Sequence, residues 1–289
     1  MTFEVDWVDA FADAAFSGNG CAVVHRGASL DDDTCMAFVR ETSLVECTFT
    51  GPSNVADIHV RYFLASREIP FAGHPTVATI AAMRARGFIQ DGTLTMETLA
   101  GVLSVEVDGT SVRMTQNAPE FGAQVDPALV ATAMGVDASD IIGTPQIVST
   151  GLPFCITVLR DRDAVRSASL NLKGLTDYAA SIGQASTDIM EPYLITLQDV
   201  PQDAQTFGRL LLAPPSAPED PFTGSATGAA ASYLWHTGLI DGSPYVAAQG
   251  DDMGRPGRAD VRLLGKSDDI TGVVVGGKAH ILISGTLNL

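Results

Sequence analysis

The chain has 289 residues, of which 46% are hydrophobic and 18% charged, and its 34 acidic and 17 basic side chains give a net charge of −17. This composition excludes a disordered chain and predicts two domains of ordinary size, each able to bury its own core. The acidic balance argues against nucleic acid or an anionic membrane as a partner, although a local site could still bind an anionic substrate.

In chain order, the first half of the sequence alternates short strands with helices. Ser29 is expected to cap a helix that ends near Glu41, with three aspartates in its first turn, where the helix dipole favours negative charge. Alternating and β-branched residues predict strands near 3–7, 21–24, 45–50 and 58–64, and two more between 94 and 114.

Over residues 117–146 Pro, Gly and Asp become more frequent, and we place the linker between two lobes there, with a short helix at 127–134. This placement predicts an N-terminal lobe at 1–116 and a C-terminal lobe at 117–289, with a last strand at about 280–289 that could return to the first lobe. A helix is expected at 172–182, and the remaining strands at 147–149, 154–159, 193–197, 245–248, 259–264, 272–275 and 280–287.

Two segments of the chain are near copies of each other. Residues 61–89 correspond to residues 209–240, and Phe71, Gly73 and Thr76 recur 151 residues later as Phe222, Gly224 and Thr227. The alanine-rich stretch in each copy has small residues on nearly every side, which is typical of a helix wrapped closely by a sheet. The duplication predicts an α+β fold of two pseudo-symmetric lobes, each a curved antiparallel sheet around a central helix, with a site where the two loops face each other.

Both copies place a glycine, Gly73 or Gly224, where a helix begins. The first N–H groups of a helix have no intrahelical partner and lie at the positive end of its dipole, and glycine lets a ligand approach them. Pro75 suits a first helical position, which leaves His74 or Gly73 as the N-cap. Two such ends could hold a small carboxylate or stabilise an enolate-like charge, whereas either loop taken alone could be an ordinary helix start.

Five sets of residues occur in order along essentially the whole chain: Asp9-Ala10-Phe11 with Ser17-Gly18-Asn19, Arg40 to Glu46, Glu68 to Thr76, Glu219 to Ala226, and Gln249-Gly250 with Met253 to Pro256. Together they resemble the phenazine-biosynthesis PhzF-like family. The resemblance implies a diaminopimelate epimerase-like fold, an active site between the two lobes, no cofactor and a homodimer.

The best-known member of that family isomerises trans-2,3-dihydro-3-hydroxyanthranilate. The resemblance therefore implies a cofactor-independent isomerase that moves a proton within a small carboxylate-bearing substrate. By position, Glu46 matches the catalytic general acid/base, and His74 and Asp220 match polar groups that bind substrate and assist proton movement. A carboxyl acid/base of this kind needs a raised pKa and a water-poor cleft. The part of the site that holds the substrate's carboxylate and ring substituents matches Gly73, Gly224 and Ser225.

Other interpretations of the same residues stay open. Glu46 lies where a surface glutamate would in an alternating strand, and Asp220 before Pro221 is a common turn pair. The chain could thus be a non-catalytic member that binds a metabolite or a protein, or an epimerase of an amino or hydroxy acid. Racemases of this architecture carry cysteines in the two loops, where this chain has Ala72 and Asp220, which counts against a two-thiol mechanism.

Two departures from the family pattern bear on the substrate. The segment that is often Asn-Leu-Ser-Glu in the family is Ser43-Leu44-Val45-Glu46 here, and the second loop ends in Thr227 instead of histidine. We expect the acid/base groups to be retained and leave the substrate open.

Other site types are excluded by motif. The five histidines form no HExxH or other close pair, so no metal site is expected. A Gly-x-Gly-x-x-Gly turn after a strand is absent, which argues against a nicotinamide cofactor, and Ser225 lacks the elbow motif of serine hydrolases.

Cysteine usage and hydropathy predict a cytoplasmic protein. The cysteines show no CxxC spacing, which is typical of buried thiols in a reducing compartment. The first residues lack a basic region followed by an apolar run, so we expect no signal peptide. No apolar run approaches about 18 residues, so we expect no membrane span. The four cysteines are Cys21, Cys35, Cys47 and Cys155.

Overall fold

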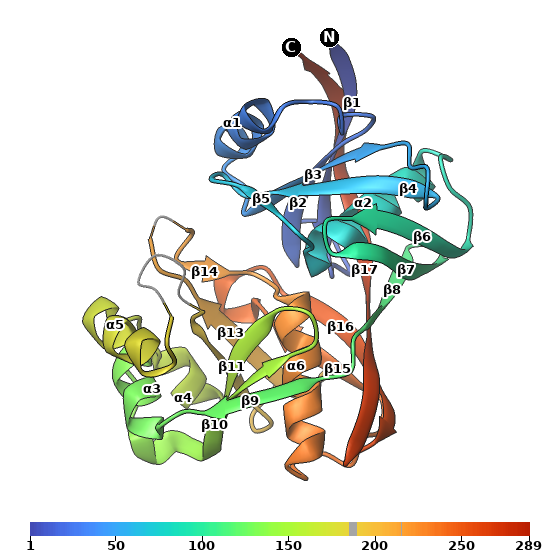
Figure 1. Cartoon of the computed structure of the whole chain (residues 1–289). Coiled ribbons are helices and arrows are strands. Elements are labelled where there is room, and N and C mark those ends of the chain that lie inside the picture. The colour runs from blue at the N-terminus through green and yellow to red at the C-terminus, as the bar shows by residue number, and fades with distance from the viewer. Residues whose placement is uncertain (185–189, 215) are drawn as a thin grey trace. The chain divides into compact units, whose positions relative to one another are not determined.

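The computed structural model describes residues 1–184, 190–214 and 216–289 (Figure 1). The chain forms two compact units, which we call unit 1 (Met1–Thr115 with Gly276–Leu289) and unit 2 (Gln116–Val275). Two strands, β8 (Ser111–Gln116) and β17 (Asp269–Asn288), continue from one unit into the other. None of the helices in the described part of the chain is both long and apolar enough to cross a membrane.

Unit 1 is a mixed sheet with two helices. Strand β1 pairs antiparallel with β2 and with the end of β17, β3 pairs antiparallel with β4, and β2–β3 and β4–β6 are parallel pairs. The helices are α1 (Asp32–Thr42) and α2 (Gly73–Ala85). The other strands are β1 (Thr2–Ala10), β2 (Asn19–Val24), β3 (Glu46–Gly51), β4 (Ile58–Phe63), β5 (Glu68–Ile69), β6 (Gly92–Thr98) and β7 (Gly101–Asp108).

Unit 2 repeats the central part of this topology. Strand β13 pairs antiparallel with β14 and parallel with β15, as β4 does with β5 and β6. Its helices are α3 (Pro127–Met134), α4 (Arg162–Ser167), α5 (Leu172–Ser181) and α6 (Gly224–His236), with 3₁₀ turns η1 (Ala138–Asp140) and η2 (Asp251–Met253). Its other strands are β9 (Glu120–Gln124), β10 (Ile141–Ser149), β11 (Pro153–Leu159), β12 (Pro192–Thr196), β13 (Thr206–Leu211), β14 (Glu219–Asp220), β15 (Tyr245–Gln249) and β16 (Gly257–Lys266).

The two repeat helices are enclosed, as their small residues predict. Every residue of α2 from Gly73 to Met83 is buried, and the helix contacts strands β1, β2 and β3. Helix α6 contacts β10, β11 and β16. At Gly228 of α6 an added Cβ would lie 1.9 Å from the Gln116 side-chain oxygen, so a larger residue would displace the Gln116 amide from its hydrogen bonds with Gly224 and Thr150. The predicted α+β class, with a central helix in each half, is confirmed.

Two predicted helix starts were wrong. Asp31, not Ser29, caps α1, because its carboxylate accepts a hydrogen bond from the Thr34 N–H at 2.8 Å. Helix α2 begins at Gly73 with Ala72 as its N-cap, so neither His74 nor Gly73 is the cap. Ala72 has extended backbone and no side chain that could bond the free N–H groups of the first turn.

Two of the strand predictions were wrong, and several elements were not predicted. Residues 94–114 belong to three strands instead of two, because the chain turns at both Gly101 (φ 108°) and Gly109 (φ 59°). The two strands expected at 272–275 and 280–287 are one, β17, since the intervening glycines allow close packing: a Cβ at Gly277 would lie 2.3 Å from the Phe11 ring. Strands β5, β9 and β14 and helix α4 were not predicted, and β13 was indicated only by the repeat.

Candidate functional site

Glu46 and His74 lie side by side in unit 1. Glu46 is the first residue of β3 and His74 the second residue of α2, and His74 Nδ1 lies 3.6 Å from Glu46 Oε2. The amide of Asn19, at the start of β2, lies 3.2 Å from the same ring nitrogen. Both proposed acid/base side chains are mostly buried, with exposed fractions of 14% for Glu46 and 6% for His74. The structure thus brings together two of the predicted site residues and adds Asn19 to them.

The imidazole of His74 is neutral at physiological pH. Burial lowers its pKa from 6.5 to about 3, and a hydrogen bond with the Gly20 backbone opposes this only in part. Among the described residues, His74 Nε2 has no hydrogen-bond partner, although the atom is buried. An unpaired buried polar atom costs roughly 1–3 kcal/mol, so a polar ligand atom at Nε2 would remove a penalty that the ligand-free protein carries.

The connection between β1 and β2 positions Asn19 through a constrained backbone. Phe11 (φ 55°) and Phe16 (φ 65°) both lie in the left-handed region, which is unfavourable for a side chain of this size. The buried Asp9 carboxylate accepts the Phe16 N–H at 2.8 Å. At Gly18 (φ 58°) a Cβ would lie 2.1 Å from the Ala10 carbonyl oxygen, so only glycine fits immediately before Asn19.

In unit 2, Asp220 ends strand β14 and is buried, with an exposed fraction of 6%. The hydroxyl of Thr223 donates to Asp220 Oδ2 at 2.5 Å. Gly224 is the first residue of α6 and Ser225 the second, so these two residues hold the positions that Gly73 and His74 hold in α2. Ser225 is half-buried, unlike its neighbours in the helix.

Neither repeat helix is capped by a side chain. The N-cap residues are Ala72 for α2 and Thr223 for α6, and neither makes a side-chain bond to the first turn. Most helices satisfy some of these N–H groups with a Ser, Thr, Asp or Asn side chain. The first turns of both helices therefore keep donors that a carboxylate ligand could use.

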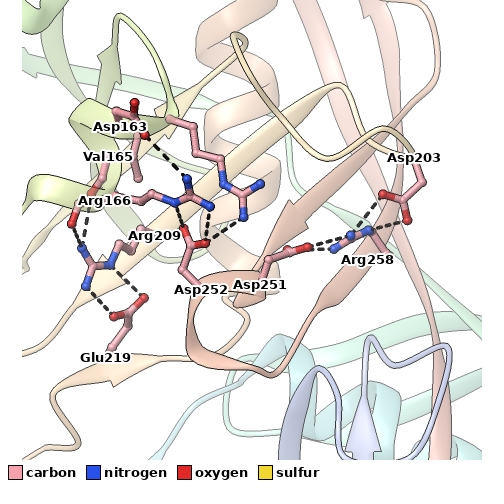
Figure 2. A network of polar contacts seen from close by, with 10 residues as sticks. Asp163, Val165, Arg166, Asp203, Arg209, Glu219, Asp251, Asp252 and Arg258 are labelled. Carbon is pink, nitrogen blue, oxygen red and sulfur yellow. Dashed lines mark hydrogen bonds and ion pairs between the residues drawn. The ribbon is translucent and has the colours of Figure 1, made fainter.

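Each loop is preceded by an arginine–glutamate clamp that sequence reasoning missed. Arg61 of β4 donates to both carboxylate oxygens of Glu68 in β5 at 2.9 and 2.7 Å. Arg209 of β13 makes the same two bonds to Glu219 of β14 at 2.9 and 2.8 Å. Figure 2 shows Arg209 also reaching the Val165 carbonyl, in α4. The sequence did contain a signal for this pairing, because Arg61 begins the first copy of the repeat and Arg209 begins the second.

Further ion pairs in unit 2 hold the segment that follows β15. Asp252 in η2 accepts from Arg166 at 2.9 Å and from Arg162 at 2.8 Å, while Asp251 accepts from Arg258 at 2.9 Å (Figure 2). Arg258 also donates to Asp203 at 2.9 Å. This segment begins directly after Gln249, and the ion pairs fix its backbone relative to α4 and β16.

The thiols are buried and protonated. Burial raises the pKa of Cys47 and Cys155 to about 11 and that of Cys35 to about 12, and it raises the pKa of Cys21 well above its ordinary value. Cys47, the neighbour of Glu46, is therefore a poor nucleophile.

Within the described ranges, no three His, Cys, Asp or Glu side chains gather in a way that could hold a metal ion.

Comparison with known proteins gives matches along the whole chain. A family model described as phenazine biosynthesis-like protein (PhzC-PhzF) matches residues 8–285. The uncharacterized isomerase YddE of Salmonella typhimurium is 30% identical over 299 residues, with 98% of this chain and 97% of that protein covered. The trans-2,3-dihydro-3-hydroxyanthranilate isomerase of Pseudomonas fluorescens is 27% identical over 294 residues, with 98% of each covered.

Solved structures agree on the fold. The PhzF-family protein of Bacillus anthracis is similar with a TM-score of 0.87 and 24% identity over all of both chains. A predicted epimerase from Pseudomonas aeruginosa has a TM-score of 0.81 and 31% identity over 99% of both chains. A hydroxyproline epimerase from Agrobacterium vitis, at 14% identity and a TM-score of 0.62 over 99% of this chain and 91% of that one, shares the fold alone. The predicted diaminopimelate epimerase-like architecture is confirmed.

Proposed function

Because the chain belongs to the phenazine biosynthesis-like (PhzF) family, whose relatives include named isomerases, we propose that it is a cofactor-independent isomerase that moves a proton within a small carboxylate-bearing substrate. The observation that supports this most is the mostly buried Glu46 carboxylate next to a neutral His74 whose Nε2 lacks a partner in the described structure. A positioned carboxyl group in a water-poor environment is suited to taking a proton from carbon and returning it elsewhere.

In this proposal Glu46 is the general acid/base. The neutral imidazole of His74 has one donor and one acceptor nitrogen, so it can hydrogen-bond a substrate hydroxyl or carbonyl without adding a charge. A fixed neutral dipole beside the reacting carbon can stabilise the electron pair that develops there when Glu46 removes the proton. The same carboxyl group then delivers the proton to a second carbon of the substrate.

The helix starts would bind the anionic part of the substrate. We assign the N–H groups at Gly73 and Gly224 and the Ser225 hydroxyl to the carboxylate and ring substituents of the substrate. In neither helix does an N-cap side chain accept a hydrogen bond from the first turn, so these N–H groups can bind a ligand. Asp220 would bind a polar substituent and assist proton movement. That the two loops share one substrate, and that the protein is a homodimer in a phenazine-type pathway, stay predictions.

The two alternatives have less support. A non-catalytic binding protein would have no use for a buried Glu46 beside His74, and a two-thiol epimerase lacks its bases, since Ala72 and Asp220 occupy the loop positions and the four thiols are buried with raised pKa values. Solvent-proton exchange separates an enzyme from a binding protein, and inversion of a stereocentre separates an epimerase from an isomerase.

The test is an NMR assay in deuterium oxide with trans-2,3-dihydro-3-hydroxyanthranilate. We expect the wild type to convert it with deuterium at a ring carbon, and Glu46→Gln to lose roughly 10²–10⁴-fold in rate, the usual contribution of a general acid/base. Glu106→Gln, an exposed glutamate on β7, is the matched control and should behave as wild type. No conversion of this compound by the wild type would refute this substrate, and unchanged turnover by Glu46→Gln would remove Glu46 from the mechanism.

A further inference from the structure

The side-chain amide of Gln249 makes most of its hydrogen bonds to the loop that carries Asp220. Gln249 is the last residue of β15 and is fully buried. Its Oε1 accepts the Tyr193 hydroxyl and the Thr223 N–H, both at 3.1 Å. Its Nε2 donates to the Asp220 carbonyl at 2.7 Å and to Thr223 Oγ1 at 3.2 Å. An amide offers two donors and two acceptor sites, so its capacity is filled, and three of its four bonds go to residues 220–223.

Thr223 completes the connection to the carboxyl group. It occupies the N-cap position of α6, where a threonine oxygen usually accepts an N–H of the first turn and contributes roughly 0.5–2 kcal/mol. Here the hydroxyl donates to Asp220 Oδ2 at 2.5 Å instead, while it accepts from Gln249. The helix forgoes a stabilising cap, and the same hydroxyl fixes one oxygen of the acid.

The backbone behind Gln249 is held close to this loop. At Gly250 (φ 83°) a Cβ would lie 2.6 Å from the Pro221 carbonyl oxygen, and at Gly257 it would lie 2.3 Å from the Phe222 ring. The ion pairs of η2 shown in Figure 2 hold the residues between these two glycines. Gln249 therefore extends from a closely packed support.

The corresponding loop of unit 1 lacks this arrangement. The residues 151 positions earlier are Ile69, Ala72 and Thr98, which provide neither a carboxylate, a hydroxyl at the cap, nor an amide. There the loop backbone is bonded by the Ala100 N–H, which donates to the Pro70 carbonyl at 3.2 Å. The hydrogen-bonded set of Asp220, Thr223 and Gln249 thus occurs in the copy of the loop that carries a carboxylate.

We propose that Gln249, acting through Thr223, is a positioning residue that holds the Asp220 carboxyl group in its productive orientation. This inference rests on the proposed function of Asp220. Holding a reacting or binding group within a fraction of an ångström matters because a displacement of about 1 Å can cost on the order of 10²-fold in rate. The bonds fix both the backbone of Asp220, through its carbonyl, and its side chain, through Oδ2.

The kinetic test replaces the hydroxyl of Thr223. Thr223→Val keeps the shape but removes the donor to Asp220, so we expect kcat to fall roughly 10–100-fold with KM within about threefold. Thr223→Ser restores the hydroxyl and should recover most of kcat. Thr196→Val is the matched control, because it removes another buried hydroxyl, which accepts the Gln198 N–H at 3.1 Å and takes no part in this chain of bonds, and it should lower stability without lowering kcat. A Thr223→Val enzyme with both kcat and KM within twofold of wild type would overturn the proposal.

A second measurement needs no substrate and separates this inference from the proposed function. Gln249→Met removes the acceptor of the Thr223 N–H, so hydrogen exchange at that amide should accelerate at least about tenfold, while Thr196→Val leaves it unchanged. If the wild type does not turn over the test carboxylate, the proposed function fails for that substrate. The exchange result then tests only whether Gln249 holds the Thr223 backbone. Unchanged exchange in Gln249→Met would overturn this inference.

Discussion

The loops that lead into α2 and α6 share a backbone frame and differ in the side chains that carry chemistry. In both, an arginine clamps the glutamate of a two-residue strand, and a glycine begins the helix. In both, a threonine hydroxyl donates back to the carbonyl of the N-cap residue: Thr76 to Ala72 at 2.7 Å and Thr227 to Thr223 at 3.0 Å. The duplication thus retains the supports and not the reactive groups.

What differs is the origin of the polar groups. In unit 1 they come from neighbouring strands, because Asn19 and Glu46 begin β2 and β3 beside His74. In unit 2 the loop itself supplies Asp220 and Thr223, and Gln249 holds them. In the proposed function the duplicated frame divides its roles: one copy would hold the acid/base pair, and the other would hold a substrate-binding acid.

The largest effect is expected from crowding the backbone that positions Asn19. Gly18→Ala combines a left-handed φ with a Cβ 2.1 Å from the Ala10 carbonyl oxygen, so it should lower the free energy of unfolding by about 3–5 kcal/mol. Gly87→Ala is the control, because its φ is also positive but nothing lies within 4 Å, and it should cost only about 1–2 kcal/mol. Equal losses in urea unfolding would show that the turn before Asn19 is not constrained as described.

The paired clamps test whether the two frames are equivalent. Arg61→Met and Arg209→Met each leave a mostly buried glutamate without its partner and should each cost about 2–4 kcal/mol of unfolding free energy. The double variant Arg209→Met/Glu219→Met should recover most of that loss, since no buried charge is left unpaired. A large loss in one unit and none in the other would contradict the equivalence.

A titration sharpens the difference between His74 and Ser225, which occupy the same helical position. The pKa of His74 is near 3 in the folded protein and near 6.5 when unfolded, so the unfolded chain binds the extra proton between these values. The contribution of His74 to the free energy of unfolding should therefore be fully present above pH 6.5. It should decrease as the pH drops toward 3, by up to about 1.4 kcal/mol per pH unit. The difference in stability between wild type and His74→Gln should shrink over that window, and a difference independent of pH would contradict the burial of a neutral ring.

The smallest effects concern the two buried tyrosines that support the loops. Tyr62 hydrogen-bonds Thr76 at 2.7 Å, and Tyr193 donates to Gln249 at 3.1 Å. Removal of either hydroxyl, in Tyr62→Phe or Tyr193→Phe, should lower the unfolding free energy by about 1 kcal/mol, because each partner keeps another hydrogen bond. Thermal unfolding of the two variants checks this, and a loss of several kcal/mol in either would show that its hydroxyl has a larger role.

Much of the fold could be predicted from the sequence because the repeat is visible, at a constant offset of 151 from Phe71 onward, and the small residues of α2 and α6 have one physical explanation. Helix starts were harder: Ser29, Asp31, Gly73 and His74 all suit a cap by residue type, and only local geometry selects among them. The predicted strand limits were wrong at glycines, because glycine has different roles at different positions. Gly101 turns the chain, whereas Gly277 lies within a strand and allows an aromatic ring to approach.

The candidate site could be predicted only in part. Motif resemblance named Glu46, His74 and Asp220, and the structure places the first two together. Their supports were missed because they depend on contacts between distant parts of the chain: Asn19 reaches His74 from another strand, and Gln249 reaches Asp220 across 29 residues. Periodicity and spacing do not encode such contacts, although Gln249 lies in a motif that the resemblance had already marked.

The division of roles between the two loops is tested most directly by solvent-deuterium incorporation into trans-2,3-dihydro-3-hydroxyanthranilate, measured in parallel for wild type, Glu46→Gln and Asp220→Asn. We predict that Glu46→Gln abolishes deuterium incorporation, whereas Asp220→Asn slows it and raises KM, since only Glu46 exchanges the proton with carbon. Abolished incorporation in Asp220→Asn together with near-normal incorporation in Glu46→Gln would place the acid/base in unit 2 and contradict the assignment.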